Sequence, residues 1–231
     1  MISKISSEIK SLGNKERAAV SQRFFKTGKG QYGEGDIFIG LTVPVSRMIA
    51  EKYADIPLGS VKLLLHSRIH EERLIALLIL AEKFGKAGEK QKKEIVHFYL
   101  RNTAFVNNWD LVDLSADKII GAYLSDKNRS VLYSLAKSEN LWEKRIAIVS
   151  TFYFIRNNDF NETFKIAEIL MKDRHDLIHK AVGWMLREAG KRDRPLLESF
   201  LKEHCRTMPR TMLRYAIEHF DRKKRLFFMS H

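Results

Sequence analysis

The segment ERLIALLILAEKF, residues 72–84, decides the fold class of this chain. Its apolar residues recur every three or four positions, which is the repeat of one face of an α-helix. Alternating strand patterns are nearly absent, and the four prolines lie near the polar joints between helical segments. The pattern therefore predicts an all-α chain. The same helical spacing returns in KKEIVHFYLRN (92–102), DLVDLSADKIIGAYL (110–124), RSVLYSLAKS (129–138), KRIAIVSTFYFIRN (144–157), FNETFKIAEILMK (160–172) and LIHKAVGWMLREAGKR (177–192).

Helices of one type begin at intervals of 33 to 39 residues, at positions 70, 109, 142, 178 and 212. Periods of this size are typical of α-solenoids, in which each helix pair covers the apolar face of its neighbour. We expect one helical-repeat domain over residues 1–231, with N-terminal helices and a glycine-rich loop in 1–60, stacked helix pairs in 61–221 and a basic tail in 222–231. A solenoid curves, and a basic concave face suits duplex DNA.

The charge balance favours a polyanionic partner. The chain has 41 Lys and Arg against 28 Asp and Glu, a formal net charge of +13 and a pI near 9.8. Such a surplus is typical of proteins that bind nucleic acid, although some basic proteins have no such partner. Residues 172–231 hold 15 basic and 8 acidic side chains, a net of +7, so we expect the partner to contact this part.

Cysteine usage and hydropathy favour a cytoplasmic protein. A single cysteine, Cys205, excludes an internal disulfide framework, and the eight histidines show no metal-ligand spacing. The longest apolar run, LIALLILA at 74–81, is far shorter than the roughly 18 residues that span a bilayer, and the N-terminus lacks an apolar signal core. We expect a soluble monomer in the cytoplasm, with no metal, no cofactor and no membrane partner.

Three glycines imitate a nucleotide-binding motif. Gly28, Gly30 and Gly33 match G-x-G-x-x-G, which binds dinucleotides only between a strand and a helix. Here the preceding segment SQRFFKTG has a helical pattern, so a glycine-rich turn is the better interpretation. Lys26 and Lys29 beside it could meet a phosphate.

The segment VNNWDLVDLSA, residues 106–116, carries a carboxylate at an unexpected position. Asn107 or Asn108 followed by Asp110 is typical of a helix N-terminus. Asp113 lies one turn further along, on the same face as Trp109. An isolated carboxylate is costly to bury, so Asp113 belongs either to an ion pair between repeats or to a functional groove.

The next two repeats carry further polar or aromatic residues on helix faces. Arg145 shares a face with Trp142 and Val149, which suits either an ion pair with Asp113 or a phosphate ligand. Trp184 is either a half-exposed residue packed on neighbouring aliphatic stems or an aromatic wall for a sugar or base. Cations that we place on the face of Trp184, as phosphate contacts, are Lys180, Arg187, Lys191 and Arg194.

These motifs resemble the AlkD family of DNA alkylation repair glycosylases. The resemblance is carried by NNWDLVD (107–113), WEKR (142–145) and VGWMLREAGKRD (182–193), and FFKTGKGQYGEGDIFIGLTVP (24–44) is also similar to a sequence common in that family. It covers nearly the whole chain. The resemblance implies HEAT-like repeats and a double-stranded DNA substrate containing positively charged N3- or N7-alkylated purines, which the family removes without a base-flipping pocket.

The resemblance also assigns roles to residues. It implies that Asp113 is catalytic, that Trp109 and Trp184 are cleft tryptophans and that Arg145 is the cleft arginine. An ionised carboxylate suits a reaction that builds positive charge on a sugar, because it stabilises that charge or orients water. Two alternatives remain open: a non-catalytic scaffold that binds nucleic acid or an acidic protein, with Asp113 and Arg145 as a structural bridge, and a DNA-structure binder that kept the fold and lost activity.

Overall fold

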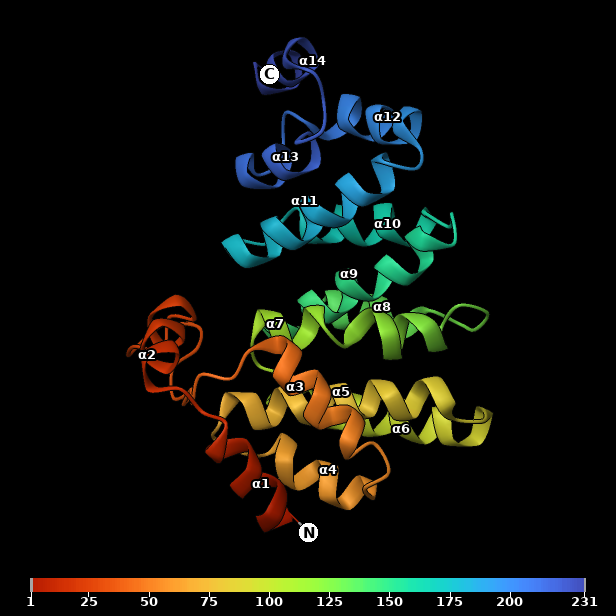
Figure 1. Ribbon diagram of the computed structural model, residues 1–231. Helices are drawn as coiled ribbons and strands as arrows, with labels where there is room; N and C mark the ends of the chain where they lie inside the picture. The colour runs from red at the N-terminus through yellow and green to blue at the C-terminus, as the bar shows by residue number, and fades with distance from the viewer. Residues whose placement is uncertain (1, 231) are drawn as a thin grey trace. The chain divides into compact units, whose positions relative to one another are not determined.

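The computed structural model describes residues 2–230 and is built almost entirely of α-helices (Figure 1). Fourteen α-helices follow one another in this range, together with one 3-10 helix and one π-helix. Within the described range the extended pairing is limited to an isolated bridge between Ile37 and Ile69. The predicted all-α class is confirmed. None of the helices in residues 2–230 combines the length and the apolar character needed to cross a bilayer.

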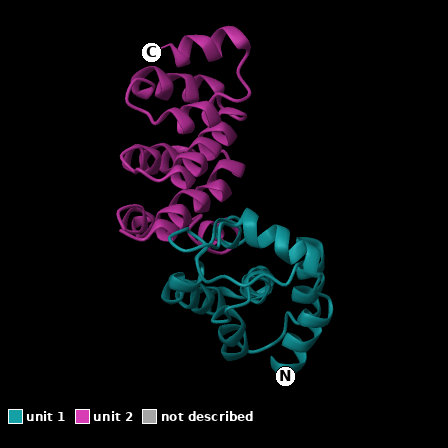
Figure 2. Ribbon diagram, turned by 90° about the vertical axis from the view of Figure 1, so that its left-hand side faces the viewer, with its two compact units in different colours: residues 1–115 teal, residues 116–231 magenta. Residues whose placement is uncertain are grey.

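The chain divides into two compact units (Figure 2). Unit 1 is residues 1–115 and unit 2 is residues 116–231. Unit 1 contains α1 (Ile2–Ser11), α2 (Lys15–Phe24), α3 (Val43–Lys52), α4 (Leu58–Leu65), α5 (His70–Lys86), α6 (Glu89–Arg101), the 3-10 helix η1 (Thr103–Phe105) and α7 (Trp109–Asp113). Unit 2 contains the π-helix η2 (Asp117–Gly121), α8 (Ser130–Ala136), α9 (Leu141–Arg156), α10 (Asn161–Leu170), α11 (Asp176–Gly190), α12 (Arg194–His204), α13 (Arg210–Ala216) and α14 (Arg222–Met229).

Helix α5 is the centre of unit 1. It packs against α3, α4, α6 and α7, and residues 70–80 are all buried. A helix that is apolar on every side belongs in a core, which explains the uninterrupted segment LIALLILA. The helix begins at His70, the predicted start, and its first four residues, HEER, are charged or titratable and nevertheless buried. The partners of His70 and Arg73 form part of the candidate site described below.

A loop of turns, residues 25–42, connects α2 to α3. The carboxylate of Glu71 accepts backbone N–H groups of Ile39 and Gly40 at 3.1 and 2.7 Å, so α5 holds the end of this loop. Gly40 has a φ of +83°, and a Cβ there would lie 2.2 Å from the Asn14 carbonyl oxygen, so only glycine fits. Because α2 and not a strand precedes Gly28, the nucleotide-binding context is missing, as expected.

The continuous helix predicted over 110–124 was wrong. Helix α7 ends at Asp113, and the chain then passes through a turn into η2. The Ser115 hydroxyl donates to the Leu111 carbonyl at 2.6 Å, a contact that bends helices. In η2, a Cβ on Gly121 would lie 2.2 Å from the Ser150 carbonyl oxygen, so this backbone packs directly on α9.

Unit 2 consists of stacked helix pairs. Helix α9 packs on α8, α10 and α11, and α11 in turn packs on α12 and α13. Helix α11 lies close to the backbone of α13 at Gly183, where a Cβ would lie 2.5 Å from the Met212 carbonyl oxygen. The helices predicted at 142, 178 and 212 begin at Leu141, Asp176 and Arg210, within two residues of the expected positions.

The basic tail is a helix over most of its length. Residues 222–229 form α14, and the Asp221 carboxylate caps it by accepting the Lys224 backbone N–H at 2.9 Å. Phe228 is buried, with its ring centroid 5.8 Å from that of Phe220. The described part of this segment is therefore packed on unit 2, and position 231 lies outside the described residues.

Candidate active site

Trp109 and Asp113 are the first and last residues of α7. They lie four positions apart and therefore on one face of the helix, as predicted. Both side chains are partly exposed, whereas Asp110, Leu111 and Val112 between them are buried. The three central residues thus anchor α7 in unit 1, while the Trp109 indole and the Asp113 carboxylate remain partly exposed.

Aromatic side chains at the end of α2 and at the start of the loop 25–42 support Trp109. The Phe25 ring stacks on the Trp109 ring, with centroids 5.1 Å apart and planes at 11°. Phe24 meets the Trp109 ring edge-on at 5.9 Å and is itself 63% exposed. The indole of Trp109 is therefore held on one face by Phe25 and bordered by an exposed aromatic ring.

A buried network of charged side chains connects α7 to α5 and to the loop 25–42. The Nδ1 atom of His70 is 3.0 Å from Asp36 Oδ2, and its Nε2 atom is 2.8 Å from Asp110 Oδ2. Arg73 forms an ion pair with the other oxygen of Asp36 at 2.6 Å. Two acids and two bases thus compensate one another inside unit 1, as buried charges must.

The protonation state of this network follows from its contacts. Burial alone disfavours a charged His70, but the Asp110 charge and the hydrogen bonds to Asp110 and Asp36 outweigh it and hold the pKa of His70 above its usual value. Burial alone raises the pKa of Asp36, but the hydrogen bond from His70 and the charge of Arg73 outweigh it and hold this pKa below its usual value. Both ring nitrogens of His70 also face carboxylate oxygens, which accept when ionised, so the contacts fit an imidazolium that donates from both nitrogens.

The same network fixes the start of α7. Of the two asparagines proposed as helix caps, Asn108 is the one that caps α7. Its Oδ1 accepts the Trp109 backbone N–H at 2.8 Å. Its Nδ2 donates to Asp36 Oδ2 at 3.2 Å. Asp110, predicted to be an ordinary first-turn acid, also binds His70. Sequence reasoning missed His70, Asp36 and Arg73, although charged residues at the start of the apolar α5 were an available signal.

Arg145 lies in the interior of the structure. It belongs to α9, is 5% exposed, and donates from a guanidinium nitrogen to the Leu177 carbonyl oxygen at 2.7 Å. Leu177 is in the first turn of α11. The guanidinium therefore connects two neighbouring helices of unit 2.

Trp184 of α11 is partly exposed, in agreement with the expectation that it is not a core residue. Its ring contacts Phe152 of α9, with centroids 5.7 Å apart and planes at 49°. The contact fixes the indole on one side and leaves part of it accessible.

The four cations predicted to bind phosphate each have a carboxylate partner in unit 2. Three of them belong to α11 or directly follow it, but Arg194 is the first residue of α12, because Asp193 caps that helix. The shared face expected for Arg194 was therefore wrong. The pairs are Lys180 with Asp176 at 2.7 Å, Arg187 with Glu218 and with Glu188 at 3.3 Å, Lys191 with Glu188 at 2.8 Å, and Arg194 with Glu198 at 3.1 Å.

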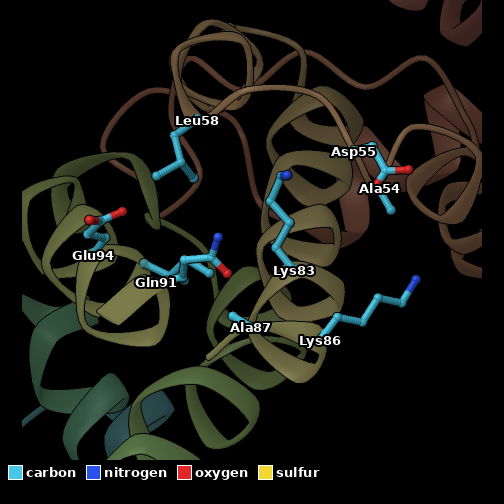
Figure 3. Close-up of a pocket in the computed structure, with 9 residues that line it drawn as sticks. Ala54, Asp55, Leu58, Lys83, Lys86, Ala87, Gln91 and Glu94 are labelled. Atoms are coloured by element: carbon cyan, nitrogen blue, oxygen red, sulfur yellow. The ribbon is translucent and has the colours of Figure 1, made fainter. Parts of the chain in front are cut away.

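A cavity of about 290 Å³ opens in unit 1 and is lined by residues between positions 54 and 95. Figure 3 shows Lys83 and Lys86 of α5 and Glu94 of α6 among the side chains that line it. Neither Trp109 nor Asp113 contributes to its lining. Among residues 2–230, no group of three or more His, Cys, Asp or Glu side chains is arranged to hold a metal ion.

The fold is shared with solved structures. A chain described as "Predicted DNA alkylation repair enzyme from Enterococcus faecalis" matches with a TM-score of 0.70 and 17% identity, over 91% of this chain and 97% of that one. AlkD2 from Streptococcus mutans matches with a TM-score of 0.58 and 17% identity, over 90% of this chain and 99% of that one. At this identity the likeness shows the fold, which is that of AlkD-type helical-repeat proteins. No curated protein matches the chain.

The sequence profile of the DNA alkylation repair enzyme family matches residues 5–220. This match covers nearly the whole chain, so the chain belongs to the DNA alkylation repair enzyme family.

Proposed function

We propose that the chain is a DNA glycosylase that hydrolyses the N-glycosidic bond of positively charged N3- or N7-alkylated purines in double-stranded DNA. Membership of the repair family and the net charge of +13 support a DNA substrate. The observation that carries the proposal is the pair at the ends of α7, where Asp113 and Trp109 lie on one face and are both accessible.

The alkylated base is already an activated leaving group, so the protein has to supply little catalysis. An N-alkylated purine already carries positive charge, so the electron pair of the breaking bond neutralises it and the base leaves without a general acid. The deoxyribose becomes oxocarbenium-like, and water adds to its anomeric carbon and releases a proton. An ionised Asp113 stabilises the sugar cation and orients the water, the role that a carboxylate has in glycoside hydrolysis.

The tryptophans take a supporting role in this proposal. The electron-rich face of an indole attracts a nearby cation by about 0.5 to 2 kcal/mol. Trp109 is held by Phe25 and Trp184 by Phe152, so each presents a fixed ring to the sugar or to the bases beside it. Contact through the sugar requires no base-flipping pocket, which most glycosylases use to reach the base.

Phosphate contacts are assigned to Arg145 and to the cations of unit 2. Lys180, Arg187, Lys191 and Arg194 exchange a carboxylate partner for a phosphate when DNA binds. Exchange of one anion for another keeps each cation paired throughout. We propose that the protein acts as a monomer and without a cofactor.

The decisive experiment measures free bases by mass spectrometry after incubation with methylated duplex DNA. Wild type should release 7-methylguanine and 3-methyladenine, and Asp113→Asn should release neither while retaining DNA binding. Asp55→Asn removes an exposed carboxylate of the same unit and should behave as wild type. Equal release by wild type and Asp113→Asn would show that Asp113 is not the catalytic carboxylate.

A second candidate function is a binder of DNA structure without catalysis. The burial of Arg145 and its hydrogen bond to the Leu177 carbonyl favour this alternative, because they hold the guanidinium against another helix inside the protein. A protein of this kind would bind methylated and unmethylated DNA and release no base from either. The same mass-spectrometric assay therefore separates the two functions.

A further inference from the structure

His70 is well placed to control α7 although it cannot touch a substrate. It is 1% exposed and is the first residue of α5. Its two ring nitrogens reach different parts of unit 1: Asp36 belongs to the loop 25–42, and Asp110 belongs to α7. A single side chain thus joins three segments that are far apart in sequence.

The network around His70 is electrically balanced. The imidazolium and Arg73 carry two positive charges, and Asp36 and Asp110 carry two negative charges. These are the charged groups that face His70 from α5, from the loop and from α7. Loss of the positive charge on His70 leaves an excess negative charge in a buried place, where the cost of an unpaired charge is greatest.

An aromatic stack connects His70 to Trp109 by a second route. The Phe38 ring stacks on His70 at 4.3 Å, and the Phe25 ring stacks on Phe38 at 4.7 Å. Phe25 in turn stacks on Trp109 at 5.1 Å. Phe25 also contacts His70 directly, with ring centroids 5.2 Å apart, so this aromatic cluster joins the ring of His70 to the indole through Phe25.

We propose that His70 is a positioning residue of the active site, which holds the start of α7 through Asp110 and Asp36 and thereby sets the places of Trp109 and Asp113. This role rests on the proposed glycosylase function and extends it to a residue that contacts neither DNA nor water at the reacting sugar. A flat ring with two opposed donors meets both requirements at once, because it stacks on Phe38 and joins two carboxylates.

The kinetic test compares His70→Gln with His97→Gln. Glutamine keeps a polar side chain but removes the positive charge, while His97 is an exposed histidine of α6 in the same unit and serves as the control. We expect His70→Gln to lower the single-turnover rate of base release by about 10- to 100-fold, the usual effect of a displaced catalytic group, with unchanged DNA affinity. His97→Gln should retain the wild-type rate.

A double variant provides the rescue. His70→Gln leaves the network with one excess negative charge, and Asp110→Asn in the same chain removes it. The double variant should recover part of the rate lost in His70→Gln. If folded His70→Gln keeps the wild-type rate, His70 has no positioning role.

A spectroscopic test separates this role from the proposed activity. The chain has three tryptophans, and Trp109→Phe identifies the indole N–H resonance of Trp109 in ¹⁵N-labelled protein. In wild type this resonance should move as the pH rises through the titration of His70, and in His70→Gln it should lose that movement. If wild type releases no base, the proposed activity fails, and this titration alone decides about His70: a Trp109 resonance that does not follow the pH overturns the positioning role.

Discussion

The Nε2 atom of His70 lies 2.8 Å from a carboxylate oxygen of Asp110, which directly follows Trp109 in the chain. The first residue of the central helix of unit 1 is thereby bonded to the short helix that carries both Trp109 and Asp113. The partly exposed face of α7 that carries Trp109 and Asp113 is thus held in place by the buried ion pair of His70 and Asp110.

The free energy of unfolding should reach its maximum between about pH 4 and pH 6.5, the usual pKa values of Asp and His in unfolded chains. The raised pKa of His70 contributes stability below pH 6.5, and this contribution is lost as the pH rises through the folded-state pKa. The lowered pKa of Asp36 contributes above pH 4 and is lost as the pH falls. Urea unfolding across pH 3–9 measures both limits. His70→Gln should lack the alkaline decline, and parallel curves for the two proteins would contradict the assignment.

Asp36→Asn should destabilise the protein by about 3 to 5 kcal/mol, the usual cost of removing one partner from a buried charge network. Asp36 binds His70, Arg73 and Asn108, so its neutralisation leaves two buried cations with one anion. Urea unfolding at neutral pH gives the change directly. Asp55→Asn, at an exposed position, is the matched control and should change stability little. A loss as small as that of the control would mean that the network contributes no net stability.

Gly183→Ala should destabilise unit 2 by about 1 to 3 kcal/mol, the usual cost of overpacking. The added Cβ would lie 2.5 Å from the Met212 backbone oxygen, which cannot rotate away as a side chain would. Gly85→Ala is the control, because a Cβ on this residue of α5 meets nothing within 4 Å, and it should leave stability equal or raise it by up to about 1 kcal/mol. Thermal unfolding of both variants makes the comparison. Equal melting temperatures would show that α11 and α13 can separate without cost.

Lys191→Gln and Glu188→Gln should change DNA affinity in opposite directions. Glu188 pairs with both Lys191 and Arg187, so its neutralisation frees Lys191 and removes one of the two carboxylate partners of Arg187, which should tighten binding. Lys191→Gln should weaken binding and reduce the slope of log K against log salt by about one. Fluorescence anisotropy with a labelled duplex at several salt concentrations measures both effects. If neither variant changes the affinity, the DNA contacts of the protein lie outside this part of α11.

Periodicity predicted the helix starts well, including Trp109 of α7, but failed at the end of α7. The starts of α9, α11 and α13 fall within two residues of their expected positions, because long amphipathic helices are specified by their own apolar spacing. The segment 110–124 has the same spacing and is nevertheless broken after Asp113. One local and one tertiary contact accompany the break: the Ser115 hydroxyl donates to the Leu111 carbonyl, and the backbone at Gly121 packs against Ser150 of α9. Neither contact leaves a mark in the hydrophobic pattern.

The exposed residues of the candidate site could be predicted from the sequence, but the residues that hold them in place could not. Trp109 and Asp113 are four residues apart in a helical segment, so their common face follows from helix geometry. His70 and Asp110 are 40 positions apart, and nothing in local spacing relates them. The same holds for Phe25 and Trp109, which stack although they lie in different segments of unit 1.

The sequence by itself determined the all-α class, the periods of the helices and the residues at the ends of α7, because these depend on interactions between residues a few positions apart. Only the tertiary structure decided that His70 is a buried imidazolium between two carboxylates, that Arg145 is buried against the Leu177 carbonyl and that the predicted phosphate-binding cations already have acidic partners. Charge and burial depend on which segments meet in three dimensions. A side chain has its chemical identity from the sequence, but its protonation state and its available partners come from the fold.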